Sequence, residues 1–107
     1  MKAKKKFGQN FLVDRYFISK IVNEINPKEG NNILEIGPGK GAITEPVLKK
    51  INQISVVEID PDMIKILKAK ISTKNISILA EDVLGINDEF FEKFNKIIGN
   101  LPYYIAT

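Results

Sequence analysis

The apolar positions along the chain follow two alternating spacings, one typical of helices and one typical of buried strands. Apolar side chains three and four positions apart predict amphipathic helices. The first helix is expected to begin after Asp14 as its N-cap and to end at Asn26-Pro27. The helices predicted in this way cover residues 15–26, 42–51, the segment that follows the Asp60-Pro61 start signal, and residues 88–94.

Short runs rich in isoleucine, valine and leucine lie between these helices and predict strands. They cover residues 32–36, 53–59, 75–79 and 96–99. Helices and strands in strict alternation predict an α/β fold, with a parallel sheet, helices on both faces and right-handed crossovers. The order across the sheet is expected to be third, second, first, fourth, because the third crossover jumps back past the first strand. Ligands of such sheets bind beyond the carboxyl ends of the strands.

Composition narrows the class of protein. The 107 residues are 44% apolar and 27% charged, which predicts one folded domain. The sequence has no cysteine and no histidine, which excludes disulfides, thiolate chemistry, histidine bases and the usual zinc sites. No apolar stretch reaches the roughly 18 residues of a membrane span, and the start lacks the apolar centre of a signal peptide. We therefore expect a cytoplasmic protein that binds neither metal nor membrane.

The positive charge is confined to the N-terminus. Of the 16 basic residues four are lysines within the first six positions, so residues 7–107 carry 12 basic and 13 acidic residues. One interpretation is a solvated chain end. The other is an RNA-binding arm in which Lys4, Lys5 and Lys6 contact phosphates while Phe7, with Phe11, offers stacking surfaces.

The ends of the first two strands carry a glycine-rich turn and an acid. The glycines at 37, 39 and 41 match neither the dinucleotide fingerprint nor the triphosphate loop, and a plain strand–helix turn is the alternative. Glu58 follows Gly37 by 21 residues, the interval at which an acid reaches ribose hydroxyls in nucleotide-binding sheets. The alternative for Glu58 is a solvent-facing acid beside the Asp60 cap.

The ends of the third and fourth strands carry groups suited to a purine amine. Asp82 could accept from an adenine amino group, or be an ordinary surface acid. Pro102 holds Leu101 extended, so the Leu101 carbonyl and the Asn100 side chain can converge on one exocyclic amine, beside the flat ring of Tyr103. Two acceptors on its protons would favour a pyramidal, nucleophilic nitrogen. The alternative is a strand exit with aromatic core residues.

Taken together, these segments resemble the ribosomal RNA adenine dimethyltransferase family. The match is carried, in order, by Lys6-Phe7-Gly8-Gln9-Asn10-Phe11-Leu12, Glu35-Ile36-Gly37-Pro38-Gly39-Lys40-Gly41, Val57-Glu58-Ile59-Asp60, Glu81-Asp82-Val83 and Asn100-Leu101-Pro102-Tyr103. The chain is more similar to the small-subunit enzymes than to the macrolide-resistance branch, which acts on the large-subunit RNA and usually has isoleucine at the position of Leu101.

The resemblance implies a Rossmann-like class I methyltransferase fold, S-adenosyl-L-methionine as cofactor, and methyl transfer by direct displacement. It places Gly37 near the methionine part, Glu58 on the ribose and Asp82 on the adenine, with Tyr103 stacked on a target base taken out of its stack. The cofactor residues it implies are Asn10, Leu12, Gly37, Gly39, Glu58, Ile59, Asp82, Val83 and Asn100. The catalytic residues it implies are Asn100, Leu101, Pro102 and Tyr103.

The family pattern also sets expectations for organisation and partners. Residues 1–12 would form a basic arm that covers the cofactor, and residues 13–107 the N-terminal half of the cofactor-binding domain, with about four strands. Ribosomal RNA and the small ribosomal subunit would be the partners. Because the family's domain continues for three more strands, we expect this chain alone to be inactive and to dimerise through its fourth strand. A non-catalytic RNA-binding or ribosome-assembly module is the main alternative, and a nicotinamide dehydrogenase fits the glycine spacing poorly.

Overall fold

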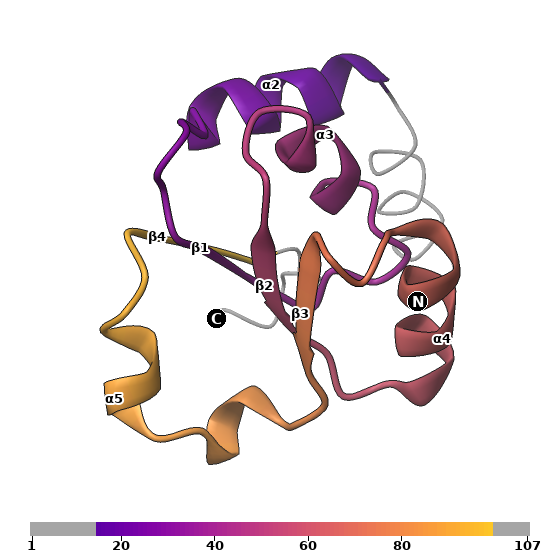
Figure 1. Ribbon diagram of the computed structural model, residues 1–107, viewed down its shortest axis with the longest axis vertical. Coiled ribbons are helices and arrows are strands. Elements are labelled where there is room, and N and C mark those ends of the chain that lie inside the picture. The colour runs from indigo at the N-terminus through magenta and orange to yellow at the C-terminus, as the bar shows by residue number, and fades with distance from the viewer. Residues whose placement is uncertain (1–14, 100–107) are drawn as a thin grey trace, which may run out of the picture.

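A computed structural model of the chain describes residues 15–99, which form a parallel four-stranded sheet flanked by helices (Figure 1). The helices are α2 (Arg15–Ile25), α3 (Thr44–Leu48), α4 (Pro61–Lys70) and α5 (Asp88–Phe91), with a 3₁₀ turn η1 (Val83–Gly85). The strands are β1 (Ile33–Ile36), β2 (Ile54–Val57), β3 (Ile76–Leu79) and β4 (Lys96–Gly99). None of the helices within this part of the chain is long and apolar enough to cross a membrane.

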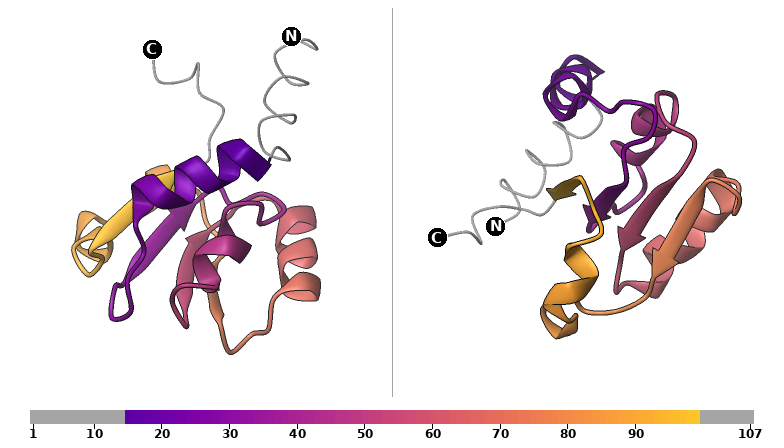
Figure 2. Two further views of the ribbon diagram at one scale, coloured as in Figure 1. Left: turned by 90° about the horizontal axis from the view of Figure 1, so that it is seen from above. Right: turned by 60° about the vertical axis from the view of Figure 1, so that its left-hand side comes forward.

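The sheet has the predicted strand order. The order is β3-β2-β1-β4 and every pair is parallel, with Leu34 of β1 aligned between Ser55 of β2 and Ile97 of β4. The strand order reverses between β1 and β4. The connection that carries α5 returns past β1 on the opposite side of the sheet from α3 and α4, so helices lie on both sides as predicted (Figure 2).

Several elements are shorter than their sequence patterns predict. The helix expected over 42–51 covers only Thr44–Leu48, because the preceding residues complete the glycine-rich turn and the Lys49 amide already bonds three residues back to the Pro46 carbonyl. The strand expected over 53–59 is Ile54–Val57, which matches the four-residue lengths of its neighbours. The turn η1 was not predicted, and the helix expected over 88–94 is the single turn of α5.

Side chains and backbone fix the helix ends. Asn26 has a φ of 50°, the left-handed conformation that ends many helices, and Pro27 follows it as predicted. The Lys96 ammonium donates to the Ile25 carbonyl at 2.8 Å and to the Asn26 carbonyl at 2.7 Å, so the start of β4 is linked to the end of α2. The predicted cap of α4 is confirmed, because the Asp60 side chain accepts from the Asp62 amide. The predicted Asp14 cap lies outside the described residues.

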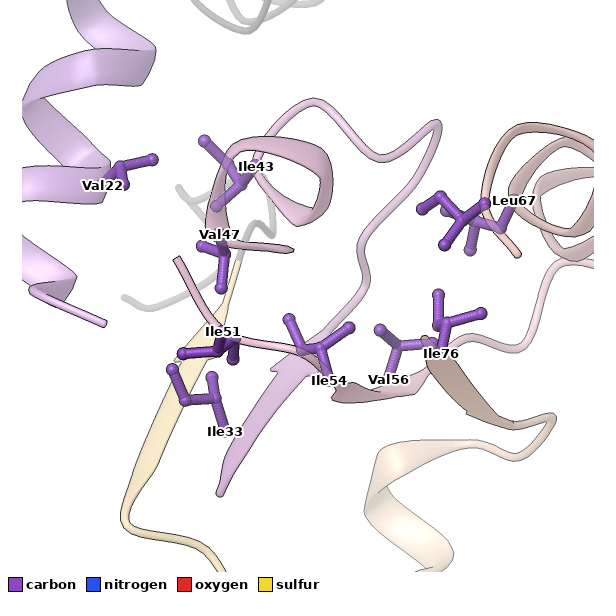
Figure 3. Packing of buried hydrophobic residues seen from close by; sticks show 10 residues of the cluster. Val22, Ile33, Ile43, Val47, Ile51, Ile54, Val56, Leu67 and Ile76 are labelled. Atoms are coloured by element: carbon purple, nitrogen blue, oxygen red, sulfur yellow. The ribbon is translucent and has the colours of Figure 1, made fainter. Parts of the chain in front are cut away.

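The hydrophobic core lies between one face of the sheet and α2, α3 and α4 (Figure 3). Apolar side chains from these helices meet apolar side chains from β1, β2 and β3 there. The buried cluster consists of Val22, Ile33, Ile43, Val47, Ile51, Ile54, Val56, Leu67, Ile71 and Ile76. The core therefore holds these helices against the strands whose carboxyl ends carry the predicted site residues.

A carboxyl group is buried next to this core. The Glu35 side chain, on β1, is fully buried, and its Oε1 accepts from the hydroxyl of Thr44 at the start of α3. Oε2 is also buried and has no hydrogen-bond partner within residues 15–99. Burial raises the pKa of Glu35 from 4.5 to about 7; the Thr44 hydrogen bond acts in the opposite direction, and the nearby charge of Glu58 raises the pKa further. The fold thus favours the protonated form of Glu35.

This raised pKa predicts a specific pH dependence of stability. The unfolded chain loses the Glu35 proton near pH 4.5 and the folded chain near pH 7. The stability of the fold should therefore decline as pH rises between these values, by roughly 3 kcal/mol in total. Glu35→Gln should remove this decline, as measured by urea unfolding at about pH 5 and about pH 8. The exposed control Glu29→Gln should keep it. A Glu35→Gln protein with the wild-type decline would contradict the prediction.

Candidate functional site

Sequence segments that are far apart meet at the carboxyl end of the sheet. The glycine-rich turn follows β1, Glu58 follows β2, Asp82 follows β3 with two residues between, and Gly99 closes β4. The switch in strand order, between β1 and β4, lies on this edge as well. This is the position at which open α/β sheets bind their ligands.

The glycine-rich turn has a backbone that glycine accommodates readily. Gly37, Gly39 and Gly41 have φ values of 67°, 57° and 89°. A Cβ atom on Gly41 would lie 3.2 Å from Leu67 Cδ2, so the Leu67 side chain on α4 would have to shift slightly to admit a larger residue there. A Cβ atom on Gly39 would meet no atom within 4 Å, so the backbone at Gly39 borders open space. The turn is packed from behind by α4 and accessible in front.

Glu58 holds the ends of β1 and β2 together. Its Oε1 accepts from the Gly39 amide at 3.2 Å and its Oε2 from the Asp60 amide at 3.0 Å. The residue is 8% exposed, so the alternative of a solvent-facing acid is wrong. Each carboxylate oxygen can accept more than one hydrogen bond. The arrangement therefore fixes the carboxylate beside the open turn and leaves it able to accept from a ligand.

The end of β3 adds an exposed acid and apolar surface. Asp82 accepts the Leu84 amide at 3.0 Å through Oδ1, and thereby caps η1. This structural role was not predicted, and it occupies one of the two carboxylate oxygens. Ile59, after β2, is 62% exposed, and Val83 is half-buried. Two acids and exposed apolar side chains at neighbouring strand ends suit a ligand that has hydroxyl and amino groups around a flat ring.

The described residues contain only part of the predicted site. Six of the predicted residues lie at the carboxyl edge of the sheet: Gly37, Gly39, Glu58, Ile59, Asp82 and Val83. The other predicted residues lie outside residues 15–99: Lys4, Lys5, Lys6, Phe7, Asn10, Leu12, Asn100, Leu101, Pro102 and Tyr103. Sequence reasoning missed the buried Glu35, whose only signal is a single acid inside the apolar run Ile33–Ile36.

A hollow in residues 15–99 lies mainly away from this edge and reaches it at Gly99. It has a volume of about 960 Å³ and lies between α2 and β4. Its lining combines isoleucines such as Ile21, Ile25, Ile43 and Ile98 with the charged residues Lys20, Glu24, Glu35 and Lys96. Gly39, Glu58 and Asp82 do not line this hollow, so it is separate from the strand-end residues described above. The same part of the chain has no group of three side chains that could hold a metal ion.

Known proteins resemble this chain in both sequence and fold. A family model described as ribosomal RNA adenine dimethylase matches residues 1–107. A protein named ribosomal RNA small subunit methyltransferase A from Mycoplasmopsis pulmonis is 48% identical over 108 residues, which is all of this chain and 42% of the relative. The protein of the same name from Neisseria meningitidis is 47% identical over 99% of this chain and 41% of its own length.

Solved structures agree with this similarity. The 23S rRNA methyltransferase ErmE matches 87% of this chain and 38% of its own, with a TM-score of 0.69 and 29% identity. A dimethyladenosine transferase from Plasmodium falciparum matches 87% of this chain and 34% of its own, with a TM-score of 0.73 and 26% identity.

These structures confirm the predicted Rossmann-like class I methyltransferase fold for the described part of the chain. The chain spans about two fifths of the length of the curated relatives that it matches. The predicted resemblance is confirmed over the whole chain, from the basic N-terminus to the segment after β4. The chain belongs to the ribosomal RNA adenine dimethylase family.

Proposed function

We propose that this chain carries the cofactor-binding part of an S-adenosyl-L-methionine-dependent enzyme that dimethylates the exocyclic amine of adenines in small-subunit ribosomal RNA. The observation that carries the proposal is the buried Glu58 carboxylate, held against the open turn at Gly39 in a member of this family. An acid in this position distinguishes a nucleoside ligand from a simple anion, because ribose offers two hydroxyl donors.

The described residues fit this cofactor. Gly37 and Gly39 would lie against its methionine part, since the backbone at Gly39 borders open space. Glu58 would accept from the ribose hydroxyls, with Ile59 beside the ring system. Asp82 would accept from the adenine amine through the oxygen that η1 does not use, next to Val83. Asn10 and Leu12 would cover the cofactor from the N-terminal arm. When bound, S-adenosyl-L-methionine supplies an electrophilic methyl group.

The segment after β4 would hold the target base. The Asn100 side-chain oxygen and the Leu101 carbonyl would accept both protons of the target amine, which favours a pyramidal nitrogen with an available lone pair. Pro102 would keep Leu101 extended, and Tyr103 would stack on the base. Asn100 would border the cofactor as well. The chemistry needs no histidine, and the proton released on methylation can pass to solvent.

The partners follow from the substrate. Lys4, Lys5, Lys6 and Phe7 would contact RNA of the small ribosomal subunit, which places the activity in the cytoplasm where ribosomes are assembled. Within residues 15–99, β4 pairs only with β1, and Ile97 is 47% exposed. We therefore propose that two copies of this chain associate through β4 when no further strand covers it, which sedimentation at increasing concentration tests.

The cofactor assignment predicts the behaviour of a Glu58 variant. Glu58→Gln replaces one acceptor oxygen with a donor group and removes the charge. It should weaken S-adenosyl-L-methionine binding by roughly 1.5–3 kcal/mol, or about 10–100-fold, in calorimetry. The matched control is Glu81→Gln, an exposed acid at the neighbouring strand end, which should bind normally. NAD should not bind to the wild-type chain. Unchanged affinity of a folded Glu58→Gln protein would remove Glu58 from the site.

The RNA assignment predicts a change in salt dependence. Deleting residues 2–6 removes four lysines. RNA binding should weaken, and the slope of log affinity against log salt should become shallower by up to about 3, since each phosphate contact contributes about 0.7–0.9. Replacing the exposed Lys65, Lys68 and Lys74 with glutamine should alter the slope less. An identical slope after the deletion would mean that the lysines are only a solvated end. RNA binding without methyl transfer by the protein that carries this chain would favour the non-catalytic alternative.

A further inference from the structure

The back of the glycine-rich turn is held by a lysine from α4. The Lys70 ammonium donates to the backbone carbonyl of Lys40 at 2.6 Å. It also lies 3.3 Å from Glu45 Oε1, on α3. One side chain thereby connects the end of α4 with the start of α3 and with the middle of the turn between β1 and α3. Lys70 and Lys40 are 30 residues apart in sequence.

The hydrogen bond to the turn distinguishes Lys70 from an ordinary surface ion pair. The side chains of Lys70 and Glu45 are 38% and 45% exposed, and an exposed pair of this kind contributes little to stability. The Lys40 carbonyl, however, lies between Gly39 and Gly41, two residues with wide backbone freedom. A contact at this point restricts a segment whose glycines allow several backbone conformations.

Three contacts on consecutive residues fix the turn. The Gly39 amide donates to Glu58, the Lys40 carbonyl accepts from Lys70, and Gly41 packs against Leu67 of α4. The peptide group between Lys40 and Gly41 has a second anchor, because its Gly41 amide donates to the Pro38 carbonyl at 3.0 Å. Loss of the Lys70 contact would leave that hydrogen bond to hold the peptide group in place. We expect the less restrained turn to hold the Gly39 amide less firmly toward Glu58, whose other oxygen still accepts from the Asp60 amide.

We propose that Lys70 is a positioning residue for the cofactor, which acts by holding the glycine-rich turn in the conformation that receives S-adenosyl-L-methionine. The inference rests on the proposed cofactor site. Lys70 lies behind the turn and does not touch the ligand, so its effect is on the free energy of ordering the turn. A turn that is already ordered loses less conformational entropy on binding.

Lys68 provides a matched control on the same helix. Lys68 and Lys70 are both exposed lysines in the last turn of α4, so each replacement removes the same charge near the same helix end. The Lys68 side chain makes no hydrogen bond or ion pair within residues 15–99. The variants to compare are Lys70→Met, Lys68→Met and the conservative Lys70→Arg, which keeps the charge and the donors.

Two measurements test the proposal. In calorimetry, Lys70→Met should raise the Kd for S-adenosyl-L-methionine about 3–10-fold, whereas Lys68→Met and Lys70→Arg should change it less than about twofold. In the chain without cofactor, Lys70→Met should accelerate hydrogen exchange at the Gly39 and Gly41 amides, and the other two variants should not.

The outcomes separate the inference from the proposed function. Equal effects of Lys70→Met and Lys68→Met would show that only net charge matters and would overturn the positioning role. A Lys70→Met protein with lower thermal stability but normal affinity and exchange would overturn it as well. If the wild-type chain itself does not bind S-adenosyl-L-methionine, the cofactor site is wrong and the positioning role is wrong with it. Unchanged hydrogen exchange in Lys70→Met would refute the restraint on the turn whether or not the cofactor binds.

Discussion

The site depends on one buried carboxylate that joins two strand ends. Glu58 accepts hydrogen bonds from the amides of Gly39 and Asp60, so the turn after β1 and the start of α4 share one charged acceptor. Hydrogen bonds to a charged group are among the stronger ones in proteins, and this pair lies where the residue is almost fully buried. The same carboxylate would receive the ribose hydroxyls. A ligand at this edge is thus bound by a group whose position the fold has already set.

The support for Glu58 comes from behind the turn. Lys70 and Leu67 contact the turn from α4, and Glu58 contacts it from just beyond the end of β2. The side toward the sheet edge borders open space at Gly39. Glycine therefore has a different role at two positions of the turn. At Gly41 it lets Leu67 of α4 approach closely, and at Gly39 it leaves open space on the side toward the sheet edge.

Much of the fold could be predicted from the sequence, because it depends on local patterns. The alternation of helical and strand spacing predicted the sheet and its order, and Asp60-Pro61 predicted the start of α4. The length of α3 could not be predicted, since Ala42 and Ile43 fit a helix but are used by the turn. Lys70 and Glu35 could not be recognised either. Their roles come from contacts with Lys40 and Thr44, which no periodic pattern records.

The candidate site was predictable in its strand-end acids and less so in their environment. The 21-residue interval singled out Glu58 but did not show that the residue is buried, and Asp82 was recognised without its role as the cap of η1.

The most direct test is a titration of the ¹⁵N-labelled chain with S-adenosyl-L-methionine, followed by amide chemical shifts. We expect saturable shifts at the strand ends, largest at Gly37, Gly39, Ile59 and Val83. Shifts confined to the hollow around Ile21 and Ile98, or no saturable shift at all, would contradict this expectation.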